Sequence, residues 1–227
     1  MQAVILAAGE GRRMRPLTEH MPKPLIEIAG KPIIEHIIDA LPPEIDEVII
    51  VVGYKAQMIM DRLGNSYGGR SIRYVHQWMP AGTAHALSIA RPFLSGTFLF
   101  MNADDIHGKE ALAQALAHPL AILVSPHETP QKFGVIELGE DGTLTAIAEK
   151  PEEPKSNLVN TGAMVLDERI FTYAAERHDN GEYYITDPFS SMAKDHAVKV
   201  IEQELWIPVG CPEDIPLAEE ILKNRKS

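Results

Sequence analysis

The chain has 227 residues, 45% of them hydrophobic, which is enough for a sizeable folded core. Its formal net charge of −11 argues against a broad DNA- or RNA-binding surface, because such surfaces are basic. The single cysteine, Cys211, excludes an intrachain disulfide, and the first apolar run, residues 3–8, is too short to span a membrane. We therefore expect a cytoplasmic protein with neither a membrane nor a nucleic-acid partner.

Short β-branched runs alternate with segments of helical period through the first half of the chain. Repeated strand–helix–strand units require parallel strands joined by right-handed crossovers. We therefore predict an α/β fold that is Rossmann-like and doubly wound, with a mostly parallel mixed sheet and helices on both faces. The predicted strands cover residues 2–6, 47–52, 71–75 and 97–101, and the predicted helices cover residues 32–41, 55–63 and 83–93.

The second half is less regular, and its strands are not separated by helices in the same way. A hairpin is expected from residues 133–138 and 143–149, which flank a turn that contains Gly142. No low-complexity linker divides the chain, so residues 1–227 are expected to form one domain. Further strands are predicted at residues 120–124, 157–166 and 198–202, and helices at residues 185–194 and 213–223.

Ligands of doubly wound sheets bind outside the carboxyl ends of the strands, which selects the loops after Leu6, Val75 and Met101. The first of these loops contains Gly9 and Gly11, and glycines allow backbone N–H groups to approach a phosphate closely. The loop lacks the third glycine of a dinucleotide fingerprint and the Gly-Lys-Ser/Thr of a P-loop. It therefore predicts a phosphate site of another type.

Basic residues follow these glycines: Arg12, Arg13, Arg15 and then Lys23, which has a proline on each side. The prolines stiffen the chain, so the ammonium group of Lys23 can be presented with little loss of entropy. Fixed cations and backbone donors stabilise the charge that develops on phosphates during nucleotidyl transfer. The alternative interpretation is an ordinary glycine turn beside a solvated basic face.

The segment LAAGEGRRMRPLT, followed by PKPL, resembles the signature of the sugar-phosphate nucleotidyltransferase family. This resemblance extends over nearly the whole chain and includes both the uridylyltransferase and the thymidylyltransferase patterns. It implies transfer of a nucleoside monophosphate from UTP or dTTP to a sugar 1-phosphate, by in-line attack on the α-phosphate and with release of pyrophosphate. The further matching segments are Gln77 with GTAHAL, the strand that ends at Asp104, FGV at 133–135, EKP at 149–151, NTG at 160–162 and GEYYITD at 181–187.

The same resemblance implies roles for individual residues. Arg13 and Lys23 would be catalytic, and Asp104 would bind Mg²⁺, a cation that prefers a few carboxylates together with substrate oxygens. The nucleotide would lie in the part up to about residue 125 and the acceptor in the part from about residue 126. The implied nucleotide-binding residues are Leu6, Ala8, Gly9, Gly11, Gln77, Gly82 and Thr83, and the implied sugar-phosphate-binding residues are Gly134, Glu149, Lys150, Asn160 and Thr186.

The chain departs from the family near its end. Pro208 stands where the family places a second magnesium-binding aspartate in a Trp-x-Asp-x-Gly segment, and proline has no side-chain oxygen. Three readings follow: Asp104 and substrate oxygens hold the metal alone, Asp105 or the 213–214 region substitutes, or the protein binds nucleotides without efficient turnover. A cytidylyltransferase for a phosphorylated alcohol such as choline phosphate is a further alternative.

Two expectations concern the assembly. The chain ends soon after the last predicted helix, so we expect a single activity and no left-handed β-helix domain of the kind that some family members carry. The sequence leaves open whether the protein forms a homo-oligomer. If each residue is considered alone, a structural role remains an alternative to the functional one: Asp104 could cap a helix, and Gln77 could be an ordinary loop amide.

Overall fold

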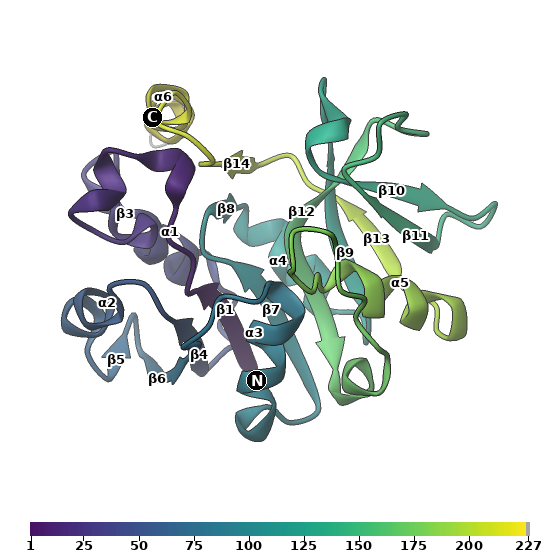
Figure 1. The fold of residues 1–227 in the computed structure, drawn as a ribbon, viewed down its shortest axis with the longest axis horizontal. Helices are drawn as coiled ribbons and strands as arrows, with labels where there is room; N and C mark the ends of the chain where they lie inside the picture. The colour runs from purple at the N-terminus through teal and green to yellow at the C-terminus, as the bar shows by residue number, and fades with distance from the viewer. Residues whose placement is uncertain (226–227) are drawn as a thin grey trace.

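The computed structural model describes residues 1–225, so the last two residues of the predicted 1–227 domain lie outside it. A ten-stranded sheet runs through the molecule in the order β11-β10-β12-β7-β1-β4-β6-β5, with β9 paired to β12 and β13 to β9 (Figure 1). The strands are β1 (Gln2–Ala7), β4 (Glu47–Val52), β5 (Ser66–Tyr67), β6 (Arg70–His76), β7 (Thr97–Asn102), β9 (Ala121–Pro126), β10 (Gly134–Leu138), β11 (Leu144–Glu149), β12 (Leu158–Asp167) and β13 (Lys199–Glu202).

The centre of this sheet is parallel, because β1 pairs in parallel with both β4 and β7, and β4 pairs in parallel with β6. β12 adds antiparallel to β7, and β10 and β11 form the predicted antiparallel hairpin. Continuous apolar runs such as VIIVV in β4 are buried on both sides, as parallel central strands require. The mixed, Rossmann-like sheet confirms the predicted fold class, and each predicted strand occurs with ends within two residues.

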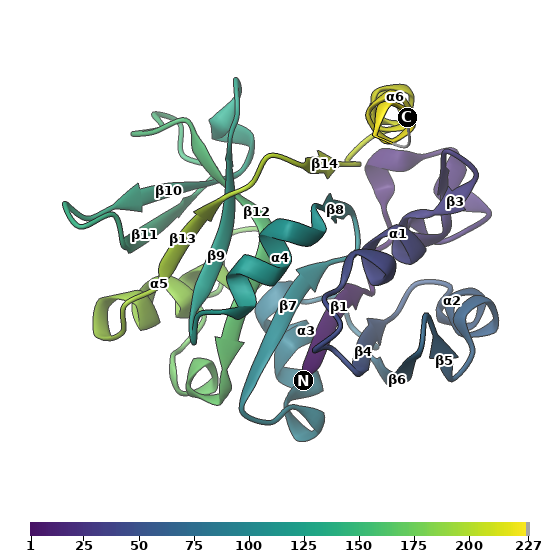
Figure 2. The same cartoon turned by 180° about the vertical axis from the view of Figure 1, so that it is seen from behind.

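Helices cover both faces of the sheet. The two views show α3 and α5 on one face, and α1 and α4 on the other (Figures 1 and 2). Each face has its own apolar core, with Ile37 of α1 in one cluster and Phe189 of α5 in the other. The helices are α1 (Ile33–Ala40), α2 (Ala56–Leu63), α3 (Thr83–Ala90), α4 (Lys109–Leu116), α5 (Thr186–Asp195) and α6 (Asp214–Asn224).

The structure corrects and extends the predicted helices. The helix predicted at residues 83–93 ends at Ala90, because Pro92 has no N–H and the chain continues as a short 3-10 turn, Arg91–Phe93. Helix α4 was not predicted. No helix within residues 1–225 combines the length and the apolar character that crossing a membrane requires.

Two small sheets were also missed. β2 (Glu27–Ile28) pairs with β3 (Lys31–Pro32), and β8 (Asp105–His107) pairs antiparallel with β14 (Trp206–Pro208). Strands of two or three residues have no detectable periodicity, and a proline inside β14 argues against a strand. The β8–β14 pair brings the C-terminal part of the chain to the carboxyl end of β7.

Candidate active site

The candidate site lies where the loops after the parallel strands β1, β4, β6 and β7 meet. The N–H of Ala103 donates to the carbonyl of Leu6 at 3.2 Å, and the N–H of Tyr54 donates to the carbonyl of Ala8 at 3.1 Å. Gly53, directly after β4, lies between two of these loops: a Cβ here would be 2.7 Å from the oxygen of Ala8 and 3.1 Å from that of Gln77. Sequence reasoning missed Gly53, although a glycine directly after a predicted strand is a usable signal.

The first glycine loop and Lys23 pack directly against each other. Gly11 has a φ of 61°, and a Cβ at this position would lie 3.0 Å from both the Cβ of Lys23 and the Cγ2 of Thr18. The hydroxyl of Thr18 also donates to the carbonyl of Gly11 at 2.9 Å. Gly9, in contrast, has nothing within 4 Å of its Cβ position, so the outer side of the loop is open.

Adjacent arginines of this loop have different surroundings. The Nε of Arg12 donates to Glu10 at 2.7 Å, and this contact lowers the pKa of the Glu10 carboxyl. Arg13 instead faces the segment after β14, with its Nη2 atom 3.7 Å from the Cβ position of Gly210. Arg12 is therefore paired locally, whereas Arg13 lies at the junction of the first loop and the C-terminal segment.

Lys23 joins this loop to the end of β7. Its Nζ donates to Oδ2 of Asp104 at 2.6 Å, with the lysine side chain 10% exposed and the aspartate side chain 38% exposed. A nearly buried ammonium group needs such a partner, since an unpaired charge there would be costly. The structure thus brings Gly11, Lys23 and Asp104 into one cluster.

Asp105, unlike the adjacent Asp104, is buried and held by side-chain contacts. Its carboxyl group is buried, accepts from Nε1 of Trp206 at 2.8 Å and contacts the amide of Asn102 at 3.5 Å. Burial, assisted by the charge of Asp104, raises the pKa of Asp105 to about 8. Asp105 is therefore less suited than Asp104 to bind a cation, because its oxygens are buried and already contact Trp206 and Asn102.

The other suggested substitute, Asp214, is also engaged. Its Oδ2 accepts from the N–H groups of Gly210 and Cys211, at 2.6 and 2.8 Å. Among residues 1–225 no group of three or more His, Cys, Asp or Glu side chains could hold a metal. One partly exposed carboxylate, that of Asp104, still fits Mg²⁺, which commonly takes one or two carboxylates and completes its shell with phosphate oxygens and water.

The loop after β6 holds Gln77 firmly. This side chain is buried, and its Nε2 lies 3.3 Å from the carbonyl of Gly82 and 2.9 Å from Nδ1 of His85. Gly82 and Thr83 stand at the start of α3. The structure therefore gathers Gln77, Gly82 and Thr83 at one end of this helix.

Three of the predicted acceptor residues form a second cluster across the hairpin. A Cβ on Gly134 would lie 3.3 Å from Oε2 of Glu149 and 3.6 Å from the Cβ of Asn160. Oδ1 of Asn160 accepts from the N–H of Gly162 at 2.9 Å. Gly162 has a φ of 81°, and a Cβ there would overlap the amide of Asn102 and lie 2.6 Å from Oδ2 of Asp105. Gly162 thus connects this cluster to the end of β7.

The remaining acceptor candidates lie at the edge of the second cluster. The Nζ of Lys150 is 3.4 Å from Oε1 of Glu149 and 5.7 Å from the ring centre of Tyr184. Thr186 begins α5, and its buried hydroxyl has no hydrogen-bond partner within the described part of the chain. Sequence reasoning did not assign a role to Tyr184, which shares the segment GEYYITD with Thr186.

A buried polar network lies behind Asp105. The Nδ1 of His107 lies 3.1 Å from the side-chain amide of Gln203, whose Nε2 donates to the hydroxyl of Thr161 at 2.7 Å. Burial lowers the pKa of His107 to about 4. The His107 imidazole is therefore neutral in the folded protein at neutral pH.

Comparisons with known proteins place the chain by sequence and by fold. The family model described as nucleotidyl transferase matches residues 2–225. The bifunctional protein GlmU of Methanocaldococcus jannaschii is 36% identical over 228 residues, which cover 99% of this chain and 55% of that protein. The chain thus spans about half the length of the GlmU relatives that it matches.

Two other relatives match over almost their full length. The UTP–glucose-1-phosphate uridylyltransferase AglF of Haloferax volcanii is 35% identical over 241 residues, which cover 99% of this chain and 97% of AglF. A crystal structure of a Bacillus anthracis protein, assigned as a glucose-1-phosphate thymidylyltransferase and bound to sucrose, superposes with a TM-score of 0.86. That match covers 99% of this chain and 96% of the other at 24% identity, so it shows a shared fold.

The buried histidine gives a prediction for the pH dependence of stability. The unfolded chain takes up a proton at His107 near pH 6.5, whereas the folded chain does so only near pH 4. The contribution of His107 to the free energy of unfolding should therefore fall by roughly 2–4 kcal/mol as the pH drops from 6.5 to 4, while the raised pKa of Asp105 contributes in the opposite direction. In urea unfolding across this range, the stability of His107→Gln relative to wild type should therefore increase as the pH drops, whereas that of His20→Gln, which changes an exposed histidine, should not. Equal pH profiles for all three proteins would refute the assignment.

Proposed function

The chain belongs to the nucleotidyl transferase family, and from this premise we propose that it transfers a nucleoside monophosphate from a nucleoside triphosphate to a sugar 1-phosphate. The observation that carries the proposal is the packing of Gly11 against Lys23, which places a nearly buried ammonium group beside Asp104 and an open glycine loop. We assign the nucleotide to the part up to about residue 125 and the acceptor to the remainder of a single domain.

Chemistry at this site requires charge stabilisation more than proton transfer. A phosphate oxygen of the sugar 1-phosphate attacks the α-phosphorus in line, a new P–O bond forms, and the bond to the bridging oxygen breaks as pyrophosphate leaves. The attacking phosphate, with a second pKa of about 6, is largely ionised at neutral pH, so no strong general base is needed. Arg13, Lys23 and the N–H groups of residues 9–11 would stabilise the charge that develops on the phosphate oxygens.

Asp104 would hold Mg²⁺ together with the triphosphate, since its carboxylate is partly exposed, whereas Asp105 accepts from Trp206 and Asp214 accepts from two backbone amides. The bound cation would supply charge neutralisation on the phosphate oxygens. Lys23, in contact with Asp104, would orient the same phosphates from the other side of the loop.

Gln77 and Gly82 would read a pyrimidine base at the start of α3, with Leu6, Ala8 and the backbone of Thr83 completing the nucleotide site, since the Thr83 hydroxyl is already bonded to the N–H of Ile185. Glu149 would accept from sugar hydroxyl groups and Lys150 would face the acceptor phosphate, with Gly134, Asn160 and Thr186 around them. The similarity to AglF along 97% of its length favours UTP with a hexose 1-phosphate, and dTTP is the next choice. The replacement of the family's second aspartate by Pro208 supports one other candidate, a nucleotide-binding protein without turnover.

A substrate panel tests the proposal. UTP, dTTP, CTP, ATP and GTP are each combined with glucose 1-phosphate, N-acetylglucosamine 1-phosphate or choline phosphate in the presence of Mg²⁺, and pyrophosphate is measured. We expect the highest kcat/KM for UTP or dTTP with a sugar 1-phosphate. Folded protein that binds UTP in calorimetry but releases no pyrophosphate would establish the non-catalytic alternative, and turnover only with CTP and choline phosphate would establish a cytidylyltransferase.

The adjacent arginines provide a matched pair of variants. Arg13→Met removes a cation that has no carboxylate partner in the described chain, and kcat should fall by about 10²- to 10³-fold, the usual effect of losing one donor to developing charge. Arg12→Met removes a guanidinium group that is already paired with Glu10, so kcat should change by less than about threefold. Steady-state kinetics under identical conditions distinguishes the two variants, and equal losses would rule out this role for Arg13.

The single-carboxylate metal site gives a third prediction. Pro208 pairs with Asp105 in the β8–β14 sheet, and the N–H of Val209 donates to the carbonyl of Asp104 at 3.0 Å, so Pro208→Asp adds a carboxylate beside Asp104. The Mg²⁺ concentration for half-maximal activity should fall about tenfold, because a second carboxylate strengthens cation binding. Pro208→Asn is the control, since it also replaces the proline but adds no charge. If Pro208→Asp and Pro208→Asn have the same Mg²⁺ concentration for half-maximal activity, the number of carboxylate ligands does not limit the affinity for the metal.

A further inference from the structure

The loop after β6 and the segment before α5 are joined by three hydrogen bonds, although they lie about 100 residues apart. The N–H of Tyr183 donates to the carbonyl of Ala81, and the N–H of Ala84 donates to the carbonyl of Tyr183, both at 2.9 Å. The N–H of Ile185 donates to the hydroxyl of Thr83, also at 2.9 Å. We call residues 81–84 and 183–185, joined in this way, the interloop contact.

This contact leaves no space between the two backbones. Gly82 has a φ of 90°, and a Cβ there would overlap the carbonyl oxygen of Tyr183 and lie 2.6 Å from its nitrogen. Helix α3 also has no side-chain cap at its N-terminus, and the carbonyl of Tyr183 accepts the otherwise unpaired N–H of Ala84. The start of α3 is therefore completed by the second half of the chain.

Each side of the interloop contact continues into one of the proposed substrate sites. On the first side, the amide of Gln77 is bonded to the carbonyl of Gly82. On the second side, the ring of Tyr184 lies below the Nζ of Lys150, and its edge packs against His178 at a ring distance of 4.7 Å. A short series of contacts thus connects the proposed base-reading side chain to a proposed acceptor-binding lysine.

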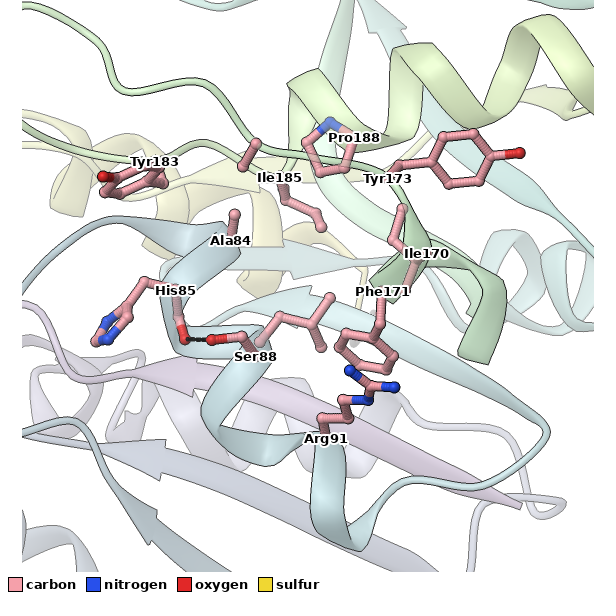
Figure 3. Close-up of a pocket in the computed structure, with 12 residues that line it drawn as sticks. Ala84, His85, Ser88, Arg91, Ile170, Phe171, Tyr173, Tyr183, Ile185 and Pro188 are labelled. Atoms are coloured by element: carbon pink, nitrogen blue, oxygen red, sulfur yellow. Dashed lines mark hydrogen bonds between the residues drawn. The ribbon is translucent and has the colours of Figure 1, made fainter.

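Beyond the interloop contact, α3 and the segment 170–188 separate around a cavity of about 360 Å³. Figure 3 shows Tyr183 and Ile185 on one side of this cavity and Ala84, His85 and Ser88 of α3 on the other. At the far end, the guanidinium group of Arg91 lies over the ring of Phe171 at 5.2 Å. The three hydrogen bonds are therefore concentrated at the end of α3 that adjoins Gln77.

We propose that the interloop contact couples the two substrate sites, and that Thr83 is a positioning residue of the acceptor segment. Among the three hydrogen bonds, that of Thr83 is the one made by a side chain, so it can be removed without changing the backbone. Binding of a nucleotide at Gln77 and Gly82 orders residues 81–84, and Thr83 transmits this order to Ile185 and Tyr184. This inference rests on the proposed function, since it assigns one site to each side of the contact.

Kinetics of Thr83→Val test the inference. The variant keeps the shape of the side chain but leaves the N–H of Ile185 without its acceptor, and the KM for glucose 1-phosphate should rise about tenfold. The Kd for UTP, measured by calorimetry without acceptor, should change by less than about twofold. Thr83→Ser restores the hydroxyl and should return the KM to within about threefold of wild type.

Ser88→Ala is the matched control, because Ser88 lies on the same helix but its hydroxyl donates to the carbonyl of His85 within that helix. This variant should behave as wild type. A Thr83→Val protein that loses UTP affinity as strongly as it loses acceptor affinity would show a nucleotide contact in place of a positioning role. An unchanged KM for the acceptor in Thr83→Val would equally overturn the inference.

Hydrogen exchange gives a readout that does not require turnover. Addition of UTP alone should slow exchange in peptides covering residues 181–187 of the wild type, and this protection should disappear in Thr83→Val but persist in Ser88→Ala. Protection confined to residues 6–13 and 77–84 would overturn the coupling while leaving the proposed function intact. If the wild type shows no turnover but UTP still protects residues 181–187, the proposed function is refuted and the coupling is retained. If the wild type shows neither turnover nor this protection, both are refuted.

Discussion

The ion pair between Lys23 and Asp104 is the contact on which the arrangement of the site depends. It joins a 3-10 turn near the N-terminus to the carboxyl end of β7, and it places a nearly buried ammonium group where the loops of the parallel strands meet. The absence of a side chain at Gly11 allows Lys23 to pack closely against the first loop. A cation held in this way needs little further ordering before it contacts a phosphate.

The adjacent carboxyl groups of Asp104 and Asp105 lie in different environments. Asp104 is partly exposed and pairs with Lys23, while Asp105 is buried, accepts from Trp206 and has a pKa raised by that burial. The same bond between Trp206 and Asp105 supports the β8–β14 pair, which brings Pro208 and the segment facing Arg13 to the site. In the proposed function Asp104 binds the metal, whereas Asp105 supports the β8–β14 pair behind it.

The two halves of the molecule meet at two places where a side chain would not fit. Gly162 closes against Asn102 and Asp105 at the end of β7, and Gly82 closes against Tyr183 at the start of α3. Both glycines have positive φ angles, which residues with a side chain rarely adopt. The proposed nucleotide and acceptor residues lie on opposite sides of these contacts, so in the proposed function each half contributes to a shared site.

Much of this protein could be read from its sequence, because periodicity and the special residues Gly and Pro act locally. Alternating apolar segments determined the strands, the helices on both faces and the parallel centre, and the glycine loop with a proline-flanked lysine indicated the site around Lys23. Three elements were not predicted correctly from the sequence: the end of α3, helix α4 and the β8–β14 sheet. Pro92 ends α3 earlier than its periodicity indicates, and the strands of the β8–β14 sheet have only three residues each, too few for a periodic pattern. Only the tertiary structure decided that Arg13 faces Gly210 while Arg12 pairs with Glu10, that Asp105 is buried, and that Thr83 holds Ile185. Burial and contacts between residues 100 positions apart arise when the whole chain packs, so no local pattern records them.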